Sequence, residues 1–353
     1  MNFIQNAIAL AIMAAVVSAP AFAQEKPKAQ KPVPVPAVKA DAAPKVDGSA
    51  DDAVWKTAPV VKLEAIKGVN FKDNKGNTNA TVQLAYTADT LYMLITYDDP
   101  TLSVKHSPYV KKADGKWEMV KDPADKGSDD NKFHGDKVSV LWNINDSIFG
   151  FTDKFSCTSV CHGGEKGKTY GNKYSEEAEE MADMWVMRYA QGGALGYGDD
   201  GYVDNTKFDP AKSPDAGRKG DASTGGGFEA IKLVNGKPEF MGKDAKPANK
   251  GGTYWVKADD KTAFDDSKFK AGDEVASVVV APFKGDRGDV SVGAKWASGK
   301  WTVEFARKLK TGSKHDIDLS DLSKTYAFGI GFFDNAQVRH AYVQAPLHLQ
   351  FQK

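Results

Sequence analysis

The alternation of apolar and polar residues predicts a chain built from short β-strands. Between Thr81 and Tyr97 apolar residues alternate with polar ones on both sides of Ala88-Asp89, which predicts a β-hairpin. Further apolar runs predict strands at residues 137–144, 254–256, 275–282, 296–309, 326–333 and 340–351. Turn residues separate these runs, and no internal repeat is apparent. The pattern therefore predicts an all-β fold, an antiparallel β-sandwich of the immunoglobulin-like kind with long loops and one or two short helices.

The first residues of the chain are typical of an export signal. Residues 8–17 are continuously apolar, and Ala21-Phe22-Ala23 provides a small-x-small cleavage site. The apolar run is too short to span a bilayer in place. Residues 24–44 are rich in proline, alanine and lysine, which predicts an extended tether without a core. We therefore expect a signal peptide at 1–23, a linker at 24–44, a folded domain at 45–353, and a periplasmic or otherwise exported location.

Charge and motif content exclude several classes of function. Lysine plus arginine and aspartate plus glutamate both number 47, and this balance argues against a nucleic-acid binder or a membrane-surface protein. The sequence has no glycine-rich phosphate loop, no Gly-x-Ser-x-Gly elbow and no histidine pair at metal-ligand spacing. We therefore expect a protein that is not itself an enzyme.

The only two cysteines lie in one short stretch, Cys157 to His162. Two cysteines followed directly by a histidine are typical of covalent haem, whose vinyl groups form thioethers with the thiols while the imidazole binds the iron. Three residues separate the cysteines instead of the usual two, which lowers the specificity of the motif. The alternative interpretation is a disulfide between Cys157 and Cys161, although a bridge that closes so small a loop stabilises little.

The segment from Ser175 to Ala190 is the best candidate for a helix. Ser175 can cap its first turn, and the glutamates that follow favour the helix dipole. Apolar residues at helical spacing would share one face; they are Met181, Met184, Trp185 and Tyr189. Core packing is the simpler interpretation of this face. Because methionine can also be a haem ligand, Met181 and Met184 remain weaker candidates for the iron.

Several stretches, taken in chain order, are similar to those of one known family. They are Val46-Asp47-Gly48 to Trp55, Asp136-Lys137-Val138-Ser139 to Trp142, Cys157 to His162, Ala182-Asp183-Met184-Trp185, Trp301 to Arg307 with Thr311-Gly312 and Asp316, and Phe332-Phe333-Asp334-Asn335 with His340. Together they resemble the haem-binding family of the ethylbenzene dehydrogenase gamma subunit, whose opening strands are shared with sandwich modules that bind sugars. The resemblance covers nearly all of residues 45–353, apart from the long charged loops.

The resemblance implies a β-sandwich that holds one haem with two axial protein ligands and transfers electrons outside the cytoplasm. In gamma subunits of molybdenum dehydrogenases that haem is non-covalent and b-type, held by a methionine and a lysine. By sequence order, His162 falls about where the methionine lies, and His340 about where the lysine lies. Both residue types differ, so ligation is inferred from position and chemistry. Other members of the broad family carry a Cys…Cys-His element at this point, which supports covalent haem.

Other residues near the two proposed ligands are weaker candidates. His348 lies eight residues from His340, a spacing that puts both on one face of a continuous strand, so it is the runner-up for the distal position. Arg188 and Arg339 are candidates for pairing with a haem propionate. Trp185 is a candidate for packing on the porphyrin. An ordinary surface or core role explains each of these residues equally well.

Three hypotheses therefore stand. The first is an exported monohaem c-type cytochrome, with haem on Cys157 and Cys161 and with His162 and His340 as ligands, passing electrons between redox partner proteins. Two imidazoles would leave no open position on the iron, which favours electron transfer over substrate chemistry. The second is a non-covalent haem b subunit of a molybdenum dehydrogenase. The third is a haem-free sandwich module that binds carbohydrate or another extracellular ligand.

Overall fold

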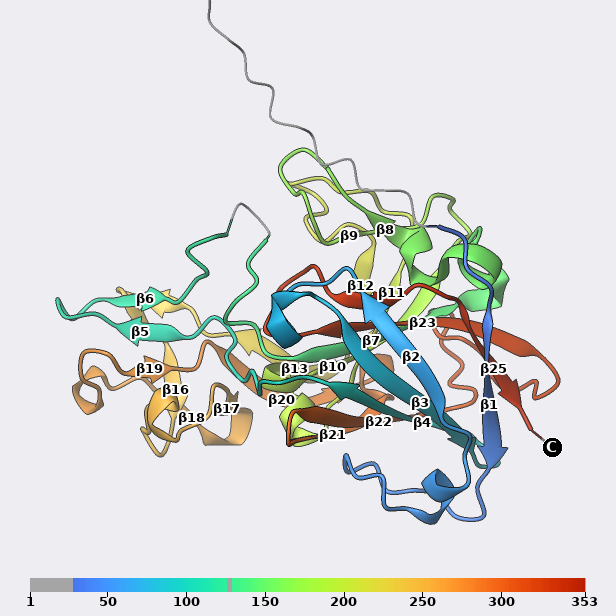
Figure 1. The fold of residues 1–353 in the computed structure, drawn as a ribbon. Helices are drawn as coiled ribbons and strands as arrows, with labels where there is room; N and C mark the ends of the chain where they lie inside the picture. The colour runs from blue at the N-terminus through green and yellow to red at the C-terminus, as the bar shows by residue number, and fades with distance from the viewer. Residues whose placement is uncertain (1–27, 126–128, 353) are drawn as a thin grey trace, which may run out of the picture.

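The computed structural model describes residues 28–125 and 129–352. Its main feature is a 13-stranded sheet, most of whose neighbouring strands are antiparallel (Figure 1). The strands of this sheet are β1 (Val33–Lys39), β2 (Val61–Ile66), β3 (Thr78–Tyr86), β4 (Thr90–Asp98), β7 (Lys137–Asn143), β10 (Ala182–Arg188), β11 (Asp199–Val203), β12 (Arg218–Gly220), β21 (Ser291–Ala297), β22 (Lys300–Lys308), β23 (Thr325–Phe333), β24 (Ala341–Val343) and β25 (Leu347–Phe351).

The sheet folds over on itself around one hydrophobic core. Its strand order is β12-β11-β10-β7-β23-β24-β2-β3-β4-β22-β21, and β1 pairs in parallel with both β3 and β25. Trp185 on β10 and Phe328 on β23 belong to the same buried cluster as Leu84 on β3 and Phe305 on β22. Because both halves of the sheet contribute to one core, the architecture is a β-sandwich. The predicted all-β sandwich is confirmed, as is the hairpin, which is β3 with β4.

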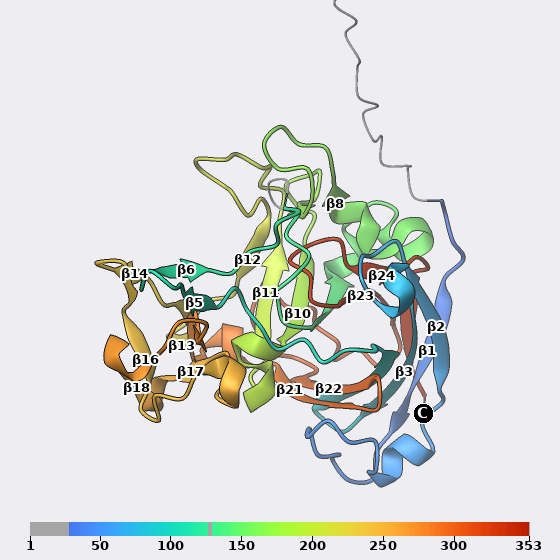
Figure 2. The same ribbon diagram turned by 60° about the vertical axis from the view of Figure 1, so that its left-hand side comes forward.

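Smaller sheets form a lobe beside the sandwich (Figure 2). Its strands are β5 (Tyr109–Lys111), β6 (Trp117–Met119), β13 (Gly225–Ala230), β14 (Leu233–Val234), β15 (Lys237–Pro238), β16 (Phe240–Gly242), β17 (Val256–Lys257), β18 (Lys261–Ala263), β19 (Glu274–Val275) and β20 (Val278–Lys284). The lobe has a separate core that includes Trp117 and Phe269. In the remaining pair, β8 (Cys161–His162) is the end of the cysteine stretch and pairs with β9 (Asn172–Lys173).

The helix predicted at residues 175–190 is wrong, because Ala182–Arg188 forms strand β10. Trp185 and Met187 point into the sandwich core, whereas Met184 and Val186 belong to a second apolar cluster on the opposite face. A strand buried on both faces has apolar residues at successive positions, so it shows no alternation and imitates a helical pattern. Ser175 instead closes a tight turn, in which its hydroxyl donates to the Glu180 carbonyl oxygen at 2.8 Å.

The linker predicted at residues 24–44 is also wrong in part. Val33–Lys39 forms β1, and the side chains of Val35 and Ala37 are completely buried. Proline is tolerated at 34 and 36 because this part of β1 pairs with β25 alone, and the pairing with β3 begins only at Ala37. The folded domain therefore begins before residue 45. The predicted signal peptide, residues 1–23, lies outside the described residues.

Short 3-10 turns connect many of the strands, and two helical turns carry the cysteine stretch. These two are the π-helical turn η4 (Phe151–Phe155) and the 3-10 helix η5 (Ser156–Val160). Across residues 28–125 and 129–352, no helix combines the length and apolar character needed to cross a membrane.

Candidate functional site

The outer face of the sandwich carries a row of residues, three of them glycines, beneath the cysteine stretch; we call it the glycine row. The strand registers align one residue from each of five strands: Gly220, Gly201, Met184, Leu141 and Gly329. Residues paired in this way point to the same face of a sheet. Three of the five residues are glycines and have no side chain. Other chain segments can therefore approach the backbone closely on this face.

Cys157 lies directly on this face, over Gly329 of β23. A methyl group added to Gly329 would come within 2.8 Å of Cys157 Cβ, so only glycine lets the cysteine segment lie this close. The Cys157 side chain is buried in an apolar cluster that also contains Met184 and Leu141. Burial raises the pKa of the Cys157 thiol to about 11, so the thiol is neutral at pH 7. Both cysteines are free thiols in the structure.

His340 lies over the next outward-facing position of the same strand, Gly331. A methyl group added to Gly331 would meet His340 Cδ2 at 2.6 Å. The imidazole stacks against Phe333 with 4.5 Å between ring centroids, and its nitrogens make no hydrogen bond to the described residues. Burial, then the charges of Lys173, Lys137 and Arg218, hold the pKa of His340 well below its usual value. The ring is therefore neutral, with a nitrogen lone pair free to bind a metal.

His162 is held away from the glycine row by the segment that follows it. Its Nε2–H donates to the Tyr174 carbonyl oxygen at 2.9 Å, and its ring stacks on the Tyr174 ring at 3.6 Å between centroids. Its Nδ1 lies 3.8 Å from a Glu176 carboxylate oxygen. The neighbouring Cys161 thiol lies 3.0 Å from the Lys173 ammonium. Strands β8 and β9 thus bring His162, Cys161 and Lys173 to one end of the site.

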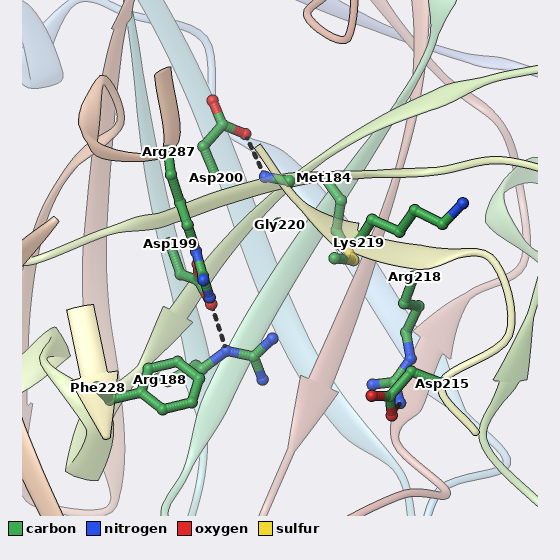
Figure 3. Close-up of a pocket in the computed structure, with 11 residues that line it drawn as sticks. Met184, Arg188, Asp199, Asp200, Asp215, Arg218, Lys219, Gly220, Phe228 and Arg287 are labelled. Atoms are coloured by element: carbon green, nitrogen blue, oxygen red, sulfur yellow. Dashed lines mark hydrogen bonds and ion pairs between the residues drawn. The ribbon is translucent and has the colours of Figure 1, made fainter. Parts of the chain in front are cut away.

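A basic pocket of about 270 Å³ opens over the other end of the glycine row (Figure 3). Arg188 and Arg287 converge there on one carboxylate, with their Nε atoms 2.9 Å and 2.7 Å from the Asp199 oxygens. Arg218 pairs with Asp215 at 3.2 Å. Met184 lines the pocket and also touches the cysteine cluster, so the two are continuous. Four basic side chains and three aspartates line the pocket, and each basic group already pairs with a carboxylate, so a carboxylate ligand would bind to the guanidinium donors that these pairs leave over.

Lys137 adds to this positive charge. Its ammonium group donates to the Ala336 carbonyl oxygen at 2.6 Å and lies 4.7 Å from the centre of the Phe333 ring. Burial and repulsion by Arg188 and Arg218 lower the pKa of Lys137 to about 7. An anion bound among these groups would relieve the repulsion.

A comparison with family models shows which protein family the chain belongs to. A family model described as ethylbenzene dehydrogenase matches residues 52–345, which is most of the chain. The protein belongs to the ethylbenzene dehydrogenase family. This family is associated with haem-containing subunits of oxidoreductase complexes. A search of curated proteins finds no match to this chain.

Three solved structures are similar to the chain at low identity. A family 9 carbohydrate-binding module from Caldicellulosiruptor kristjanssonii in complex with cellotriose is 10% identical, with 91% of this chain and 95% of that chain covered and a TM-score of 0.35. Its complex with glucose is 12% identical, with 92% and 97% covered and a TM-score of 0.35. A putative carbohydrate-binding protein from Bacteroides uniformis is 10% identical, with 91% and 99% covered and a TM-score of 0.31.

Several of the residues proposed from the sequence lie together on the outer face. Cys157 and His340 lie over glycines of β23, Cys161 Sγ lies 3.4 Å from the Cys157 carbonyl oxygen, Arg188 lines the adjoining pocket, and Met184 of the weaker candidates is part of the glycine row. His162 is at the margin of the same site, bound to Tyr174. The fold thus places the Cys157 thiol and the neutral His340 imidazole over neighbouring outward-facing positions of β23, Gly329 and Gly331.

Other proposed residues do not reach the site. Trp185 was expected to pack on a porphyrin, but it points into the core and contacts Trp142, because adjacent strand residues face opposite sides. Met181 packs against the same core. His348 lies on β25 and its Nε2 binds the Thr152 carbonyl oxygen at 2.8 Å; a loop between β24 and β25 breaks the expected continuous strand. Arg339 pairs with Asp129 at 3.3 Å.

The sequence reasoning missed Gly329, Gly331 and most of the basic groups. Gly329 and Gly331 alternate with large buried residues in β23, and glycine at every second position of such a strand is a sign of close approach on that face. The close approach at Gly329 and Gly331 could therefore have been predicted from the sequence. Arg218 begins the short strand β12 and Arg287 lies in the turn between β20 and β21; neither has a local pattern, and only the folded chain brings them to Arg188.

The residues around the glycine row are of the types that bind haem. A neutral imidazole without a hydrogen bond is a ligand for iron, two free thiols are the groups that bind vinyl carbons, and the basic pocket suits propionates. The glycines of β23 let Cys157 and His340 lie directly against the sheet, so the thiol and the imidazole occupy the space that a Cβ would fill. The pocket alone is smaller than the ~300–1,000 Å³ typical of small-molecule sites, so it fits the carboxylate edge of a cofactor rather than the whole group.

Replacing Gly331 by alanine is expected to displace His340 and destabilise the domain. The new methyl group would lie 2.6 Å from His340 Cδ2, and overpacking of this kind costs about 1–3 kcal/mol. Gly242→Ala is a matched control, because its methyl group would meet only the end of the Asp244 side chain, at 3.1 Å. Chemical denaturation should show a clear loss of unfolding free energy for Gly331→Ala alone. Equal stability of the two variants would contradict the close approach.

Proposed function

We propose that the protein is an exported monohaem c-type cytochrome that transfers single electrons. The observation that carries this proposal is the position of Cys157 and His340 over successive outward-facing glycines of β23. A thiol is the group that binds a haem vinyl carbon and a neutral imidazole is a ligand for iron, and here both lie over neighbouring positions of one strand. The membership of the ethylbenzene dehydrogenase family supports the same assignment.

The two cysteines would hold the haem, and two histidines would bind its iron. Cys157 lies against Gly329 of the sheet, and the Cys161 thiol lies beside the Lys173 ammonium. His340 would be the distal ligand. His162 would be the proximal ligand and must first release the Tyr174 carbonyl oxygen that now accepts its Nε2–H bond. When bound, the haem supplies a one-electron couple, and the protein contributes ligand identity, burial and charge.

The basic pocket would hold the propionate groups. Arg188 and Arg287 share one carboxylate in the structure, which leaves guanidinium donors available to a second. Arg218 and Lys219 line the same pocket. Because arginine binds carboxylates through two parallel hydrogen bonds, this arrangement would fix the orientation of the cofactor edge.

The redox partners of such a protein would be other proteins, either in solution or in a larger oxidoreductase complex. The family association with oxidoreductase subunits supports this role. The apolar segment and cleavage site at residues 1–23 support export to the periplasm or beyond.

Covalent attachment is tested by an intact mass and a pyridine haemochrome spectrum of full-length protein produced with haem-attachment machinery. We expect a c-type band and a mass one haem above that of the processed chain, which begins at Gln24 once the predicted signal peptide is removed. The Cys157→Ser/Cys161→Ser double variant should lose the added mass, and Ser159→Ala in the same loop should keep it. Haem that leaves the wild-type protein in acidified organic solvent would replace the proposal with a non-covalent b-type subunit. A protein without haem would leave only a ligand-binding module.

A further inference from the structure

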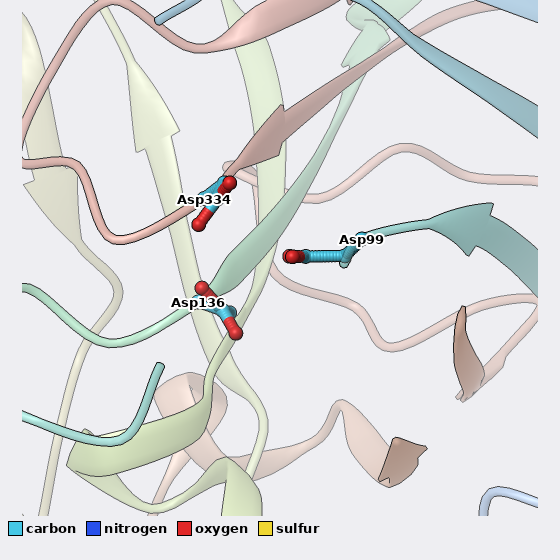
Figure 4. Close-up of side chains that lie close together, drawn as sticks. All are labelled: Asp99, Asp136 and Asp334. Atoms are coloured by element: carbon cyan, nitrogen blue, oxygen red, sulfur yellow. The ribbon is translucent and has the colours of Figure 1, made fainter. Parts of the chain in front are cut away.

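Three aspartates meet in the interior at the ends of three strands (Figure 4). Asp99 follows β4, Asp136 precedes β7, and Asp334 follows β23. Their side chains are 0%, 0% and 3% exposed, and each offers a carboxylate oxygen within 4.8 Å of the other two. Three carboxylates in one dry space repel each other strongly unless protons or a cation neutralise them.

No basic side chain within the described ranges supplies that neutralisation. None of the three aspartates forms an ion pair with lysine, arginine or histidine among residues 28–125 and 129–352. The second buried acidic group, made of Asp200, Asp221 and Asp316, is different. The Arg307 guanidinium lies 3.6 Å from Asp316 and 4.0 Å from Asp200 and serves as an internal cation there. The chain therefore provides a cation for one acidic group and leaves the other without one.

Two buried oxygens at the first group also lack a hydrogen bond. Asp99 Oδ2 has no partner, although Asp99 Oδ1 accepts from the Thr101 amide at 3.0 Å. The hydroxyl of Tyr97 is likewise unpartnered, and its side chain is completely buried. Tyr97 lies on β4 two residues before Asp99, and burial, then the charges of Asp136, Asp99 and Asp334, raise the pKa of its hydroxyl. An unsatisfied buried oxygen costs about 1–3 kcal/mol, so a ligand that binds it removes a real penalty.

The remaining hydrogen bonds hold the carboxylates in fixed orientations. Asp136 accepts from the amides of Ser103 and Asn335, at 2.8 Å and 3.0 Å. Asp334 accepts from the Phe71 amide at 2.6 Å. Backbone donors on separate segments therefore orient the oxygens before any ligand arrives, a preorganisation that favours binding.

We propose that Asp99, Asp136 and Asp334 form a buried binding site for a calcium ion. Calcium takes six to eight oxygen ligands in flexible geometry, which suits three carboxylates that each offer an oxygen within 4.8 Å of the other two. Magnesium demands near-ideal octahedral geometry and usually keeps several waters, and zinc commonly takes nitrogen and sulfur ligands, so both suit a buried all-carboxylate site less well. Tyr97 and nearby backbone carbonyl oxygens would complete the shell.

The ion would connect elements that the sequence keeps far apart. It would fix the ends of β4, β7 and β23, and Asp334 begins the segment that leads to His340. Calcium would thus stabilise the sandwich and hold in place the loop that carries the proposed distal ligand. This inference stands apart from the proposed cofactor, because the aspartates themselves are the evidence for it.

Calcium binding is tested on the purified holoprotein after treatment with a chelator. Titration calorimetry with CaCl2 should give one site per chain, and added calcium should raise the melting temperature. Asp99→Asn should weaken binding at least about 100-fold, since affinity depends on the number of charged ligands. Asp98→Asn makes the same charge change one residue away on a half-exposed side chain and should leave binding unchanged.

The elemental content of the wild-type protein keeps the proposal falsifiable if Asp99→Asn fails to fold. After dialysis against metal-free buffer, the wild-type protein should retain about one calcium per chain, and EGTA should lower its melting temperature. A protein that neither retains nor binds calcium would overturn the proposal and leave shared protons as the neutralising charge. Loss of binding in Asp221→Asn, with normal binding in Asp99→Asn, would also overturn it by moving the ion to the second acidic group.

Discussion

Replacing His340 by alanine is expected to abolish the six-coordinate, low-spin spectrum of the haem-loaded protein. His340 is the neutral imidazole that lies over Gly331, and its ring nitrogens have no hydrogen bond to give up before they bind iron. Removing it would open one coordination position, so the iron should become high-spin or bind water. The haem should stay attached, because Cys157 and Cys161 are unchanged.

Visible absorption and electron paramagnetic resonance of the purified variant measure this change. His348→Ala is the matched control, because it removes the other late-strand histidine, whose Nε2 is bound to the Thr152 carbonyl oxygen. We expect a normal low-spin spectrum in His348→Ala. A low-spin spectrum that survives in His340→Ala and disappears in His348→Ala would move the distal ligand to β25. Survival in both variants would direct attention to Met184, which lies on the same outer face.

Replacing Arg307 by methionine is expected to destabilise the domain by about 3–5 kcal/mol at neutral pH, as is usual when one partner of a buried ion pair is removed. Arg307 points from β22 into the core and is 1% exposed. Its guanidinium lies 2.5 Å from the Asp183 carboxylate on β10 and 2.5 Å from the Ile317 carbonyl oxygen. The pair therefore links the two layers of the sandwich. Without Arg307, the Asp183 and Asp200 carboxylates would lose their nearest cation.

The loss in Arg307→Met should grow as the pH rises. In the wild-type protein, burial outweighs the attraction of Arg307 and raises the pKa of Asp183 to about 6. Removing Arg307 would raise that pKa further, so the folded variant would hold a proton that the unfolded chain releases. Its stability then falls with increasing pH above about 6 relative to the wild-type protein.

Urea denaturation at pH 5 and pH 8 measures both effects. The difference in unfolding free energy between wild type and Arg307→Met should be smaller at pH 5, where the carboxyl groups are protonated more easily. Lys308→Met is the matched control, because Lys308 is the next residue of β22 and is exposed. Its unfolding free energy should stay within about 0.5 kcal/mol of the wild-type value. A cost for Arg307→Met that does not change with pH would contradict the coupling to Asp183.

Local patterns in the sequence were sufficient for the class of fold and for part of the site. Alternating residues identified the hairpin of β3 and β4, because Val82, Leu84 and Ile95 face the core while polar residues such as Gln83 and Thr96 stand between them in the sequence. The order of short motifs identified the family, which the family model confirms over residues 52–345. The cysteine stretch and His340 were found from residue type and position, and the fold brings Cys157 and His340 to the same strand.

Only the tertiary structure decided the rest. Ala182–Arg188 looks helical in sequence but is a strand, because the core on one face and the cysteine cluster on the other bury both of its sides. Trp185 therefore faces away from the site. No local pattern predicts that Arg307 and the aspartates at 99, 136 and 334 lie buried beside other charged groups, because those groups come from strands that are distant in the sequence. Residue type and spacing thus determined the fold class and the candidate ligands, while long-range strand pairing determined which side chains meet and which charges are left to be neutralised.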